Sequence, residues 1–324
     1  MKYVSSLLLF CVLYFGASGQ QKENRLAGLD TMIIRILKEW KVPGASIAIV
    51  EKNKVVLTKG FGFKDLESKK PVTETTQFDI GSCTKAFTAA LIGNAIWEKG
   101  IELDAPVSSY FPELKFMDNS LTASVTLRDM LSHRTGLPRH DLSWYSGAGT
   151  TRESLVHNIR YLEASAPLRQ RFQYNNYMYM AIGSFLEKQY GKTWEELIEE
   201  KFFSTLAMKN STTGIMGKEG DFSYGYVYKN DTNKRVDFLT TSMQAVAPCG
   251  GIVSTARDMA NWLLMWTNQG QFNGKEIIAP NFYQEAISSQ MIAAPNLPTK
   301  NMSDYYLFNY GLGWYVASYR GRYG

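Results

Sequence analysis

A serine and a lysine lie three residues apart where a short apolar run gives way to a helical pattern. In "FDIGSCTKAFTAALIGNAIWEKG", Ser82 follows Gly81 and precedes Lys85. Residues i and i+3 share one face of a helix, with Cβ atoms about 5 to 6 Å apart, so the Lys85 amine can reach the Ser82 hydroxyl. A hydroxyl at the head of a helix also lies at the positive end of the peptide dipoles, which stabilises a developing oxyanion. The pair predicts a nucleophile with its base.

This chemistry requires a lysine with an unusual pKa. A serine hydroxyl is a poor nucleophile until a base takes its proton, and lysine serves as that base only if its pKa falls from about 10.4 toward 7 to 8. A shift of roughly three units costs about 4 kcal/mol, which burial and polar neighbours must supply. The alternative is that Ser82 only caps a helix. No other serine has a lysine three residues further on, and Gly-x-Ser-x-Gly is absent.

A second element should hold the lysine and the substrate. In "RFQYNNYMYM", Tyr174 can share or relay a proton, and the carboxamide of Asn176 can bond both Lys85 and a substrate amide. A competing pair, Tyr228 and Asn230, lies in "YGYVYKNDTNKRV", whose charged centre indicates a surface hairpin turn. We therefore favour Tyr174 and Asn176. The alternative for Tyr174 is an aromatic cluster that packs at the start of a helix.

Strand patterns occur near both ends of the chain, and helical periodicity dominates the middle. A helical pattern at about 23–40 precedes two strands around a polar turn at 52–54. These patterns predict an α/β (α+β) fold, with an antiparallel sheet formed by strands from both chain ends and flanked by helices. The α/β part would comprise residues 24–80 and 220–324, and a mainly helical part residues 81–219. Ser82 would lie at their junction.

The first residues predict export. "MKYVSSLLLFCVLYFGASGQ" has one cation, an apolar run and small residues ahead of Gln20. This pattern is typical of a signal peptide, here residues 1–19, and predicts a secreted or periplasmic protein. The alternative is an N-terminal membrane anchor, but the run falls short of the roughly 20 apolar residues that cross a bilayer. No later segment is long and apolar enough to span, so we expect no membrane span after cleavage. Since no long linker divides the rest of the sequence, we expect one domain at 20–324.

Charge and cysteine content exclude several classes of function. The net charge of +5 is spread along the chain and mixed with acids, which favours a solvated surface over nucleic-acid binding. After cleavage only Cys83 and Cys249 remain, which gives neither a disulfide framework nor metal-ligand spacing. We expect Cys83 to be a small core residue. Trp144 and Tyr145 either line a substrate cleft or lie in an exposed loop.

The motif Ser82-Cys83-Thr84-Lys85, followed by Tyr174-Asn175-Asn176, resembles the serine β-lactamase-like superfamily. This superfamily comprises class C β-lactamases, D-alanyl-D-alanine carboxypeptidases and related esterases and D-aminopeptidases. The resemblance runs from about residue 26 to the end, in segments that keep the family's order: "GIELDAPVSSYFPEL", "VTLRDMLSHRTGLPRHD", "EKFFSTLAMKNST", "GGIVSTARDMANWLL" and "YGLGW".

The resemblance implies a role for each residue of the motif. Ser82 would be the acyl-accepting nucleophile, Lys85 its proton partner, Tyr174 the second acid/base group and Asn176 a substrate-orienting amide. The backbone N–H of Ser82 would be one oxyanion donor, and His133 and Arg134 would be structural. The partner would be a small-molecule or peptide substrate: a D-alanyl peptide, a β-lactam or a small ester. No metal or organic cofactor is implied.

The sequence departs from the family's pattern in its third motif. Arg134-Thr135-Gly136 resembles Lys-Thr-Gly but precedes Tyr174, and neither Lys-Thr-Gly nor His-x-Gly follows Tyr174. The strand that bears this motif carries a second oxyanion donor, whose loss costs roughly 10²- to 10³-fold in rate. We therefore expect missing C-terminal strands and a longer parent protein. The alternatives are a crippled product, a penicillin-binding sensor or another non-catalytic relative.

Overall fold

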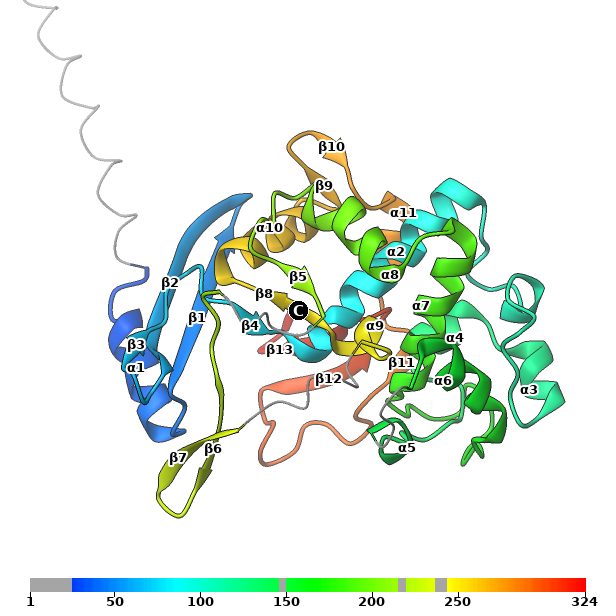
Figure 1. The fold of residues 1–324 in the computed structure, drawn as a ribbon, viewed down its shortest axis with the longest axis horizontal. Helices are drawn as coiled ribbons and strands as arrows, with labels where there is room; N and C mark the ends of the chain where they lie inside the picture. The colour runs from blue at the N-terminus through cyan, green and yellow to red at the C-terminus, as the bar shows by residue number, and fades with distance from the viewer. Residues whose placement is uncertain (1–24, 146–149, 215–219, 237–243) are drawn as a thin grey trace, which may run out of the picture.

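The computed structural model describes residues 25–145, 150–214, 220–236 and 244–324. The expected signal peptide, residues 1–19, lies outside these ranges. Within them, the helices are all too short or too polar to cross a bilayer. Figure 1 shows N-terminal strands on one side of the molecule and a larger helical part on the other. The segment that carries Ser82 and Lys85 connects the two.

The first sheet is an antiparallel hairpin with one added strand. α1 (Leu29–Glu39) precedes β1 (Gly44–Glu51) and β2 (Lys54–Asp65), and β1 pairs with the part of β2 that ends at Gly62. The short β3 (Lys70–Pro71) extends the sheet beyond β2. The turn at 52–53 has positive φ at both residues, which suits a tight hairpin between twisted strands. The predicted pair of strands around a polar turn is confirmed.

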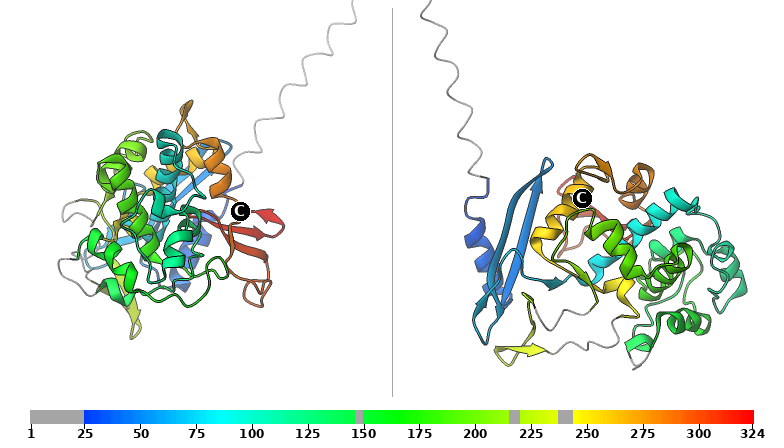
Figure 2. Two further views of the ribbon diagram at one scale, coloured as in Figure 1. Left: turned by 90° about the vertical axis from the view of Figure 1, so that its right-hand side faces the viewer. Right: turned by 45° about the horizontal axis from the view of Figure 1, so that its top comes forward.

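The N-terminal hairpin and the last strands of the chain lie in separate sheets. The C-terminal strands pair with one another in a four-stranded antiparallel sheet, β11 (Met291–Ile292), β12 (Tyr305–Tyr310), β13 (Tyr315–Tyr319) and β14 (Arg322–Tyr323). The prediction of a mixed fold with antiparallel sheets and helices is confirmed. Strands of the two predicted α/β segments pair where the short β4 (Phe78–Asp79) meets β8 (Ile252–Ser254), but among the described strands β1 and β2 form no sheet with β11 to β14. The C-terminal half meets the first sheet through α10 (Ala256–Thr267), which packs on β1 and β2. Figures 1 and 2 show α1 and α10 on opposite sides of this sheet.

Close backbone packing explains where the C-terminal sheet lies. The turn between β12 and β13 contains Gly313, which has φ of +82°. A Cβ at Gly313 would lie 2.9 Å from the Lys85 carbonyl oxygen and 3.0 Å from Ala86 Cα, so the backbone of this turn rests on the helix that follows Ser82. Leu312 N–H donates to the carbonyl of Ala286 at 3.0 Å. The hairpin is thereby fixed away from β1, which pairs only with β2 among the described strands.

The helix after Ser82, α2 (Thr84–Lys99), lies at the centre of the core. Its first twelve residues, Thr84 to Ala95, are all buried. A helix that is apolar on every side must be surrounded by other elements, and α2 contacts helices on several faces. Phe87 stacks on Trp262 of α10 with ring centroids 3.6 Å apart. The described residues between Thr84 and Phe203 consist mainly of helices, while the predicted bounds of the helical part, 81–219, stay a prediction.

The remaining elements include helices that contact α2 and others that lie further from it. The other helices of the described residues are α3 (Asn119–Ser124), α4 (Leu127–Leu131), α5 (Leu142–Tyr145), α6 (Arg152–Asn158), α7 (Asn176–Tyr190), α8 (Trp194–Ile198), α9 (Ala247–Gly250) and α11 (Pro280–Ala286), with shorter turns η2 (Val107–Ser109), η3 (Ile159–Tyr161) and η4 (Glu199–Phe203). Of these, α7, α8, α9 and α11 contact α2. A small sheet has the order β4 (Phe78–Asp79), β8 (Ile252–Ser254), β5 (Thr212–Thr213). Two hairpins are formed by β6 (Gly225–Lys229) with β7 (Thr232–Val236) and by β9 (Gln271–Phe272) with β10 (Lys275–Glu276).

Candidate active site

Ser82 lies in a 3₁₀ turn, η1 (Gly81–Cys83), that leads directly into α2. Gly81 has φ of 49°, and its N–H donates to Asp79 Oδ1 at 2.8 Å, which fixes the approach to the turn. The α-helix begins at Thr84 rather than at the predicted Ser82. Because turn and helix are continuous, the predicted proximity is kept: Lys85 Nζ lies 3.3 Å from Ser82 Oγ. Ser82 is exposed, whereas Lys85 is completely buried.

Three oxygen atoms surround the Lys85 amine. Nζ donates to the Asn176 Oδ1 at 2.9 Å and to the backbone carbonyl of Cys249 at 2.7 Å, and Ser82 Oγ is the third neighbour. A neutral amine has two N–H bonds and one lone pair. The two shorter contacts take the two N–H bonds, so the lone pair of the neutral form is directed at Ser82. The geometry suits proton transfer from the hydroxyl to the amine.

Side chains on α2 bind the backbone segment around Cys249, whose carbonyl accepts a hydrogen bond from Lys85. Thr88 Oγ1, one turn after Lys85, donates to the carbonyl of Pro248 at 2.7 Å. Thr84 Oγ1, one residue before Lys85, accepts from the N–H of Ile252 at 3.1 Å. Trp194 Nε1 donates to Thr88 Oγ1 at 3.0 Å and completes the network. The backbone around Cys249 is therefore fixed by buried hydrogen bonds on both sides of the lysine.

Burial gives Lys85 the pKa that the chemistry requires. Loss of hydration lowers the pKa of Lys85 from 10.5 to about 8. The positive charge of Arg139 acts in the same direction, and the negative charge of Asp141 opposes it. A base with this pKa is partly neutral near pH 7 to 8, where an ordinary lysine is almost entirely charged.

Tyr174 lies beside the same amine. Its ring centroid is 4.7 Å from Lys85 Nζ and 4.3 Å from the ring centroid of His133. Burial raises the pKa of Tyr174 to about 12, and a hydrogen bond with the Ser82 side chain opposes this shift. The phenol is therefore neutral at physiological pH and can donate a proton. Tyr174 also belongs to an aromatic cluster with His133, Phe172 and Tyr310, as the structural alternative predicts.

Asn176 is the first residue of α7, and its carboxamide is held from two sides. Oδ1 accepts from Lys85 Nζ, and Nδ2 donates to Asp141 Oδ1 at 3.1 Å. The preceding residue, Asn175, caps the helix by accepting from Met178 N–H at 3.2 Å. The structure thus brings all four predicted site residues together. Their catalytic roles stay predictions.

Sequence reasoning missed the support that His133 gives to this site. His133 is completely buried, and its Nδ1 accepts from the Asn175 N–H at 3.1 Å. Burial lowers the pKa of His133 well below its usual value, so the ring is neutral and fits between aromatic side chains. Arg134 points elsewhere and donates to the buried Asp129 at 2.7 Å. Only the resemblance indicated a structural role for His133 and Arg134.

We expect His133→Ala to lower the free energy of unfolding by about 3 kcal/mol. The substitution leaves a cavity in the aromatic cluster and removes the acceptor of the buried Asn175 N–H. Urea unfolding followed by circular dichroism measures the change. His157→Ala, at an exposed position on α6, is the matched control and should stay within about 0.5 kcal/mol of the wild type. Equal stabilities of the two variants would contradict the assignment of His133.

Other residues singled out in the sequence lie outside the site. Tyr228 and Asn230 lie on the β6–β7 hairpin, where Tyr228 is exposed and Asn230 has positive φ in the turn, as predicted. Cys83 is exposed, so the prediction of a core residue is wrong. The reason is that η1 turns its side chain outward before α2 enters the core.

The segment after Leu137 supplies residues that the motifs did not reveal. Trp144 is buried and donates from Nε1 to Asp141 Oδ1 at 3.3 Å, so its side chain does not lie in an exposed loop. That it lines a substrate cleft stays a prediction. The side chain of Tyr145 lies outside the described residues. Asp141 follows "RTGLPRH" directly, but nothing in its spacing from Lys85 or Asn176 indicated a contact.

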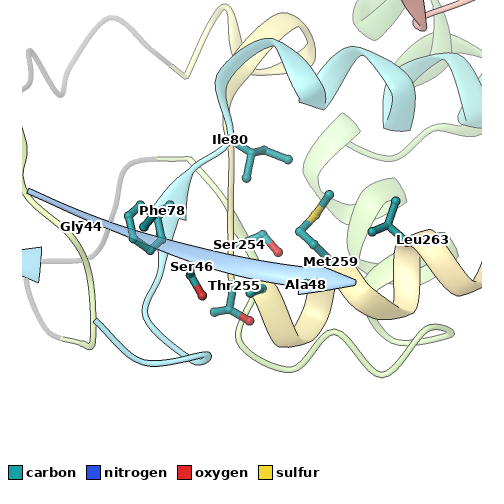
Figure 3. A pocket seen from close by; sticks show the side chains of 11 residues that line it. Gly44, Ser46, Ala48, Phe78, Ile80, Ser254, Thr255, Met259 and Leu263 are labelled. Carbon is teal, nitrogen blue, oxygen red and sulfur yellow. The ribbon is translucent and has the colours of Figure 1, made fainter. Parts of the chain in front are cut away.

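A pocket of about 390 Å³ lies apart from these residues, between β1, β4, β8 and α10 (Figure 3). Its lining is mostly apolar, with hydroxyl groups from Ser46, Ser254 and Thr255. Ser82, Lys85 and Tyr174 do not line it. In the described ranges no group of three or more histidine, cysteine, aspartate or glutamate side chains could hold a metal ion.

Comparison with known proteins identifies the family of the chain. The sequence pattern of the family described as Beta-lactamase matches residues 29–324. The chain is 27% identical over 303 residues to unguisins hydrolase ungD' of Aspergillus campestris, which covers 90% of this chain and 54% of that protein. It is 25% identical over 247 residues to protein flp of Staphylococcus aureus, covering 74% of this chain and 48% of that protein. The chain thus spans about half the length of these curated relatives.

Solved structures show the same fold. The octameric penicillin-binding protein homologue from Pyrococcus abyssi superposes with a TM-score of 0.77 at 25% identity, covering 92% of this chain and 67% of that one. A putative β-lactamase from Bacteroides dorei superposes with a TM-score of 0.66 at 22% identity, covering 89% of this chain and 78% of that one. The family match includes every residue of the site described above, from Ser82 to Cys249. The chain therefore belongs to the β-lactamase family.

Proposed function

We propose that this protein is a serine hydrolase that forms an acyl-enzyme on Ser82. One observation carries the proposal: a fully buried Lys85, with its pKa lowered to about 8 by burial, directs its amine at the Ser82 hydroxyl. A lysine that only formed a surface ion pair would keep a solvated ammonium. Here the neutral Lys85 amine donates its two N–H bonds to Asn176 Oδ1 and to the Cys249 carbonyl, so its lone pair is free to accept the Ser82 proton.

In acylation, the Lys85 amine removes the proton from Ser82 Oγ as Oγ bonds to the substrate carbonyl carbon. The backbone N–H of Ser82 is the proposed donor to the resulting oxyanion. Collapse of this intermediate breaks the bond to the leaving group, which takes a proton from the neutral Tyr174 phenol. The Lys85 ammonium then returns a proton to Tyr174. Water subsequently hydrolyses the ester on Ser82.

The reacting bond belongs to an amide, a lactam or an ester. The D-alanyl peptides, β-lactams and small esters named by the resemblance all fit this chemistry. The similarity to an unguisins hydrolase supports a hydrolytic reaction, while the similarity to the penicillin-binding protein homologue of Pyrococcus abyssi supports penicillin binding. Export follows from the N-terminal pattern of the sequence and belongs to the same proposal.

A covalent adduct tests the nucleophile directly. The full chain is incubated with a chromogenic short-chain ester or a penicillin, and intact-mass spectrometry followed by peptide mapping locates the acyl group. An adduct on Ser82 with release of product supports the hydrolase. A stable adduct on Ser82 without release supports the penicillin-binding sensor instead. The proposal fails if Ser82 stays unmodified by both reagents.

The acylation rate should rise with pH and level off above about 8. The reactive form of Lys85 is the free amine, so lowering the pH below the lysine pKa of about 8 protonates the base and reduces the rate about tenfold per pH unit. Tyr174 keeps its proton because its pKa is about 12, so its ionisation should not lower the acylation rate below about pH 10. Stopped-flow acylation across this range measures the profile. A midpoint near 10.5, the pKa of an ordinary lysine, would contradict Lys85 as the base.

A further inference from the structure

Asp141 is the meeting point of three side chains at the edge of the site. Its Oδ1 accepts from Asn176 Nδ2 at 3.1 Å and from Trp144 Nε1 at 3.3 Å, and its Oδ2 accepts from Arg139 Nε at 2.6 Å. The Asp141 side chain is 24% exposed, and the indole that contacts it is buried. Asp141 touches neither Ser82 nor Lys85 directly, so the function proposed above does not use it.

The backbone around Asp141 is anchored as well. Asn175 Nδ2 donates to the carbonyls of Leu137 and Pro138. Further along, His140 pairs with the carbonyl of Glu163 at 3.1 Å. The Asp141 carboxylate is therefore presented to α7 by a segment that is tied to the cap of that same helix.

A carboxamide has a donor end and an acceptor end, and its neighbours decide which way it points. Lys85 offers N–H groups to one end of Asn176, and the Asp141 carboxylate, which only accepts, faces the other end. A reversed carboxamide would set NH₂ against the N–H groups of Lys85 and oxygen against the carboxylate. Without Asp141 the two orientations differ only in their contact with Lys85.

We propose that Asp141 is a positioning residue, which locks the Asn176 carboxamide with its oxygen toward Lys85 and its NH₂ toward the substrate side of the site. This inference rests on the proposed function. The lock matters because a reversed Asn176 would donate an N–H to the lysine lone pair and block the proton transfer from Ser82. The locked orientation also leaves the second N–H of Asn176 Nδ2 available to a substrate carbonyl, since Asp141 is the only acceptor for Nδ2 among the described residues.

A double-mutant cycle in the full chain tests the proposal. Acylation of Ser82 by a chromogenic ester is measured at about pH 9.5, above the Lys85 pKa, so that changes in lysine charge do not enter. We expect Asp141→Ala and Asn176→Ala each to slow acylation about 10- to 100-fold, as for the loss of one charge-assisted hydrogen bond. Because Asp141 acts through Asn176, the double variant should be no slower than the slower single variant.

Asp141→Asn keeps the shape of the side chain and therefore controls for a loss of structure in Asp141→Ala. Its amide accepts or donates, so both Asn176 orientations become possible and an intermediate rate is expected. Asp231→Asn, on the β6–β7 hairpin, is the matched control and should match the wild type. Additive losses in the cycle, or wild-type acylation by the folded Asp141→Ala protein, would overturn the proposal. A wild-type chain that a fluorophosphonate does not label at Ser82 would instead count against the proposed nucleophile.

Discussion

Ser82→Ala is expected to abolish formation of the acyl-enzyme and to lower turnover of a chromogenic ester by about 10⁴-fold or more. The alanine has no oxygen to attack the carbonyl, whereas Lys85, Tyr174 and Asn176 keep their places in the core. The fold should be unaffected because the Ser82 side chain is exposed. Intact-mass spectrometry and initial rates measure the two effects in one preparation.

The neighbouring thiol provides the control for this variant. Cys83 is exposed next to the nucleophile and is itself able to react with activated esters. Cys83→Ala should therefore retain both turnover and the adduct. If Ser82→Ala and Cys83→Ala react at equal rates, the serine is not the nucleophile.

Lys85→Arg should slow acylation by about 10²- to 10⁴-fold, although it keeps the positive charge. A guanidinium stays protonated at every pH at which the protein is folded and cannot accept the serine proton. Lys85→Met replaces the amine by an apolar chain of similar length, which can be buried without loss of hydration. Its acylation rate should fall as far as that of Lys85→Arg, because it also lacks a base. Rates are measured by stopped-flow acylation at about pH 8, where about half of the wild-type base is neutral, and at about pH 9.5, where nearly all of it is.

A matched exchange distinguishes loss of the base from a general effect of substitution. Lys188 forms an exposed ion pair with Glu113, so Lys188→Arg should keep the wild-type rate. Thermal unfolding of each Lys85 variant verifies that it is folded. A folded Lys85→Arg protein with more than about a tenth of the wild-type rate would show that another group takes the proton.

The part of the site that lies along one helix was predictable, because helical geometry is local. The spacing of Ser82 and Lys85 fixes their proximity whether the first turn is 3₁₀ or α. Tyr174 and Asn176 were selected for the chemistry of a phenol and a carboxamide, and the resemblance to a known family implied the same two residues. The Cys249 carbonyl was beyond prediction, since it reaches Lys85 only through the buried bonds of Thr84 and Thr88 to the α9 region.

The sheet pairing was mispredicted for a related reason. Alternating apolar residues identify strands at both ends of the chain, but their partners depend on how tightly backbones can approach. Gly313 lets the β12–β13 turn rest on α2, and this contact rather than strand character places the C-terminal sheet. Asp141 and Arg139 were missed because their contacts depend on the anchored path of a loop.

The position of Lys85 in the core also orders events during folding. Its contacts join residues separated by 91 positions, to Asn176, and by 164 positions, to Cys249. We expect contacts this distant in sequence to form late, because the entropy of closing long loops must be overcome before such contacts stabilise the fold. Until then the lysine is hydrated and keeps an ordinary ammonium. A nascent chain therefore carries an inert serine, and reactivity appears only when the native core closes.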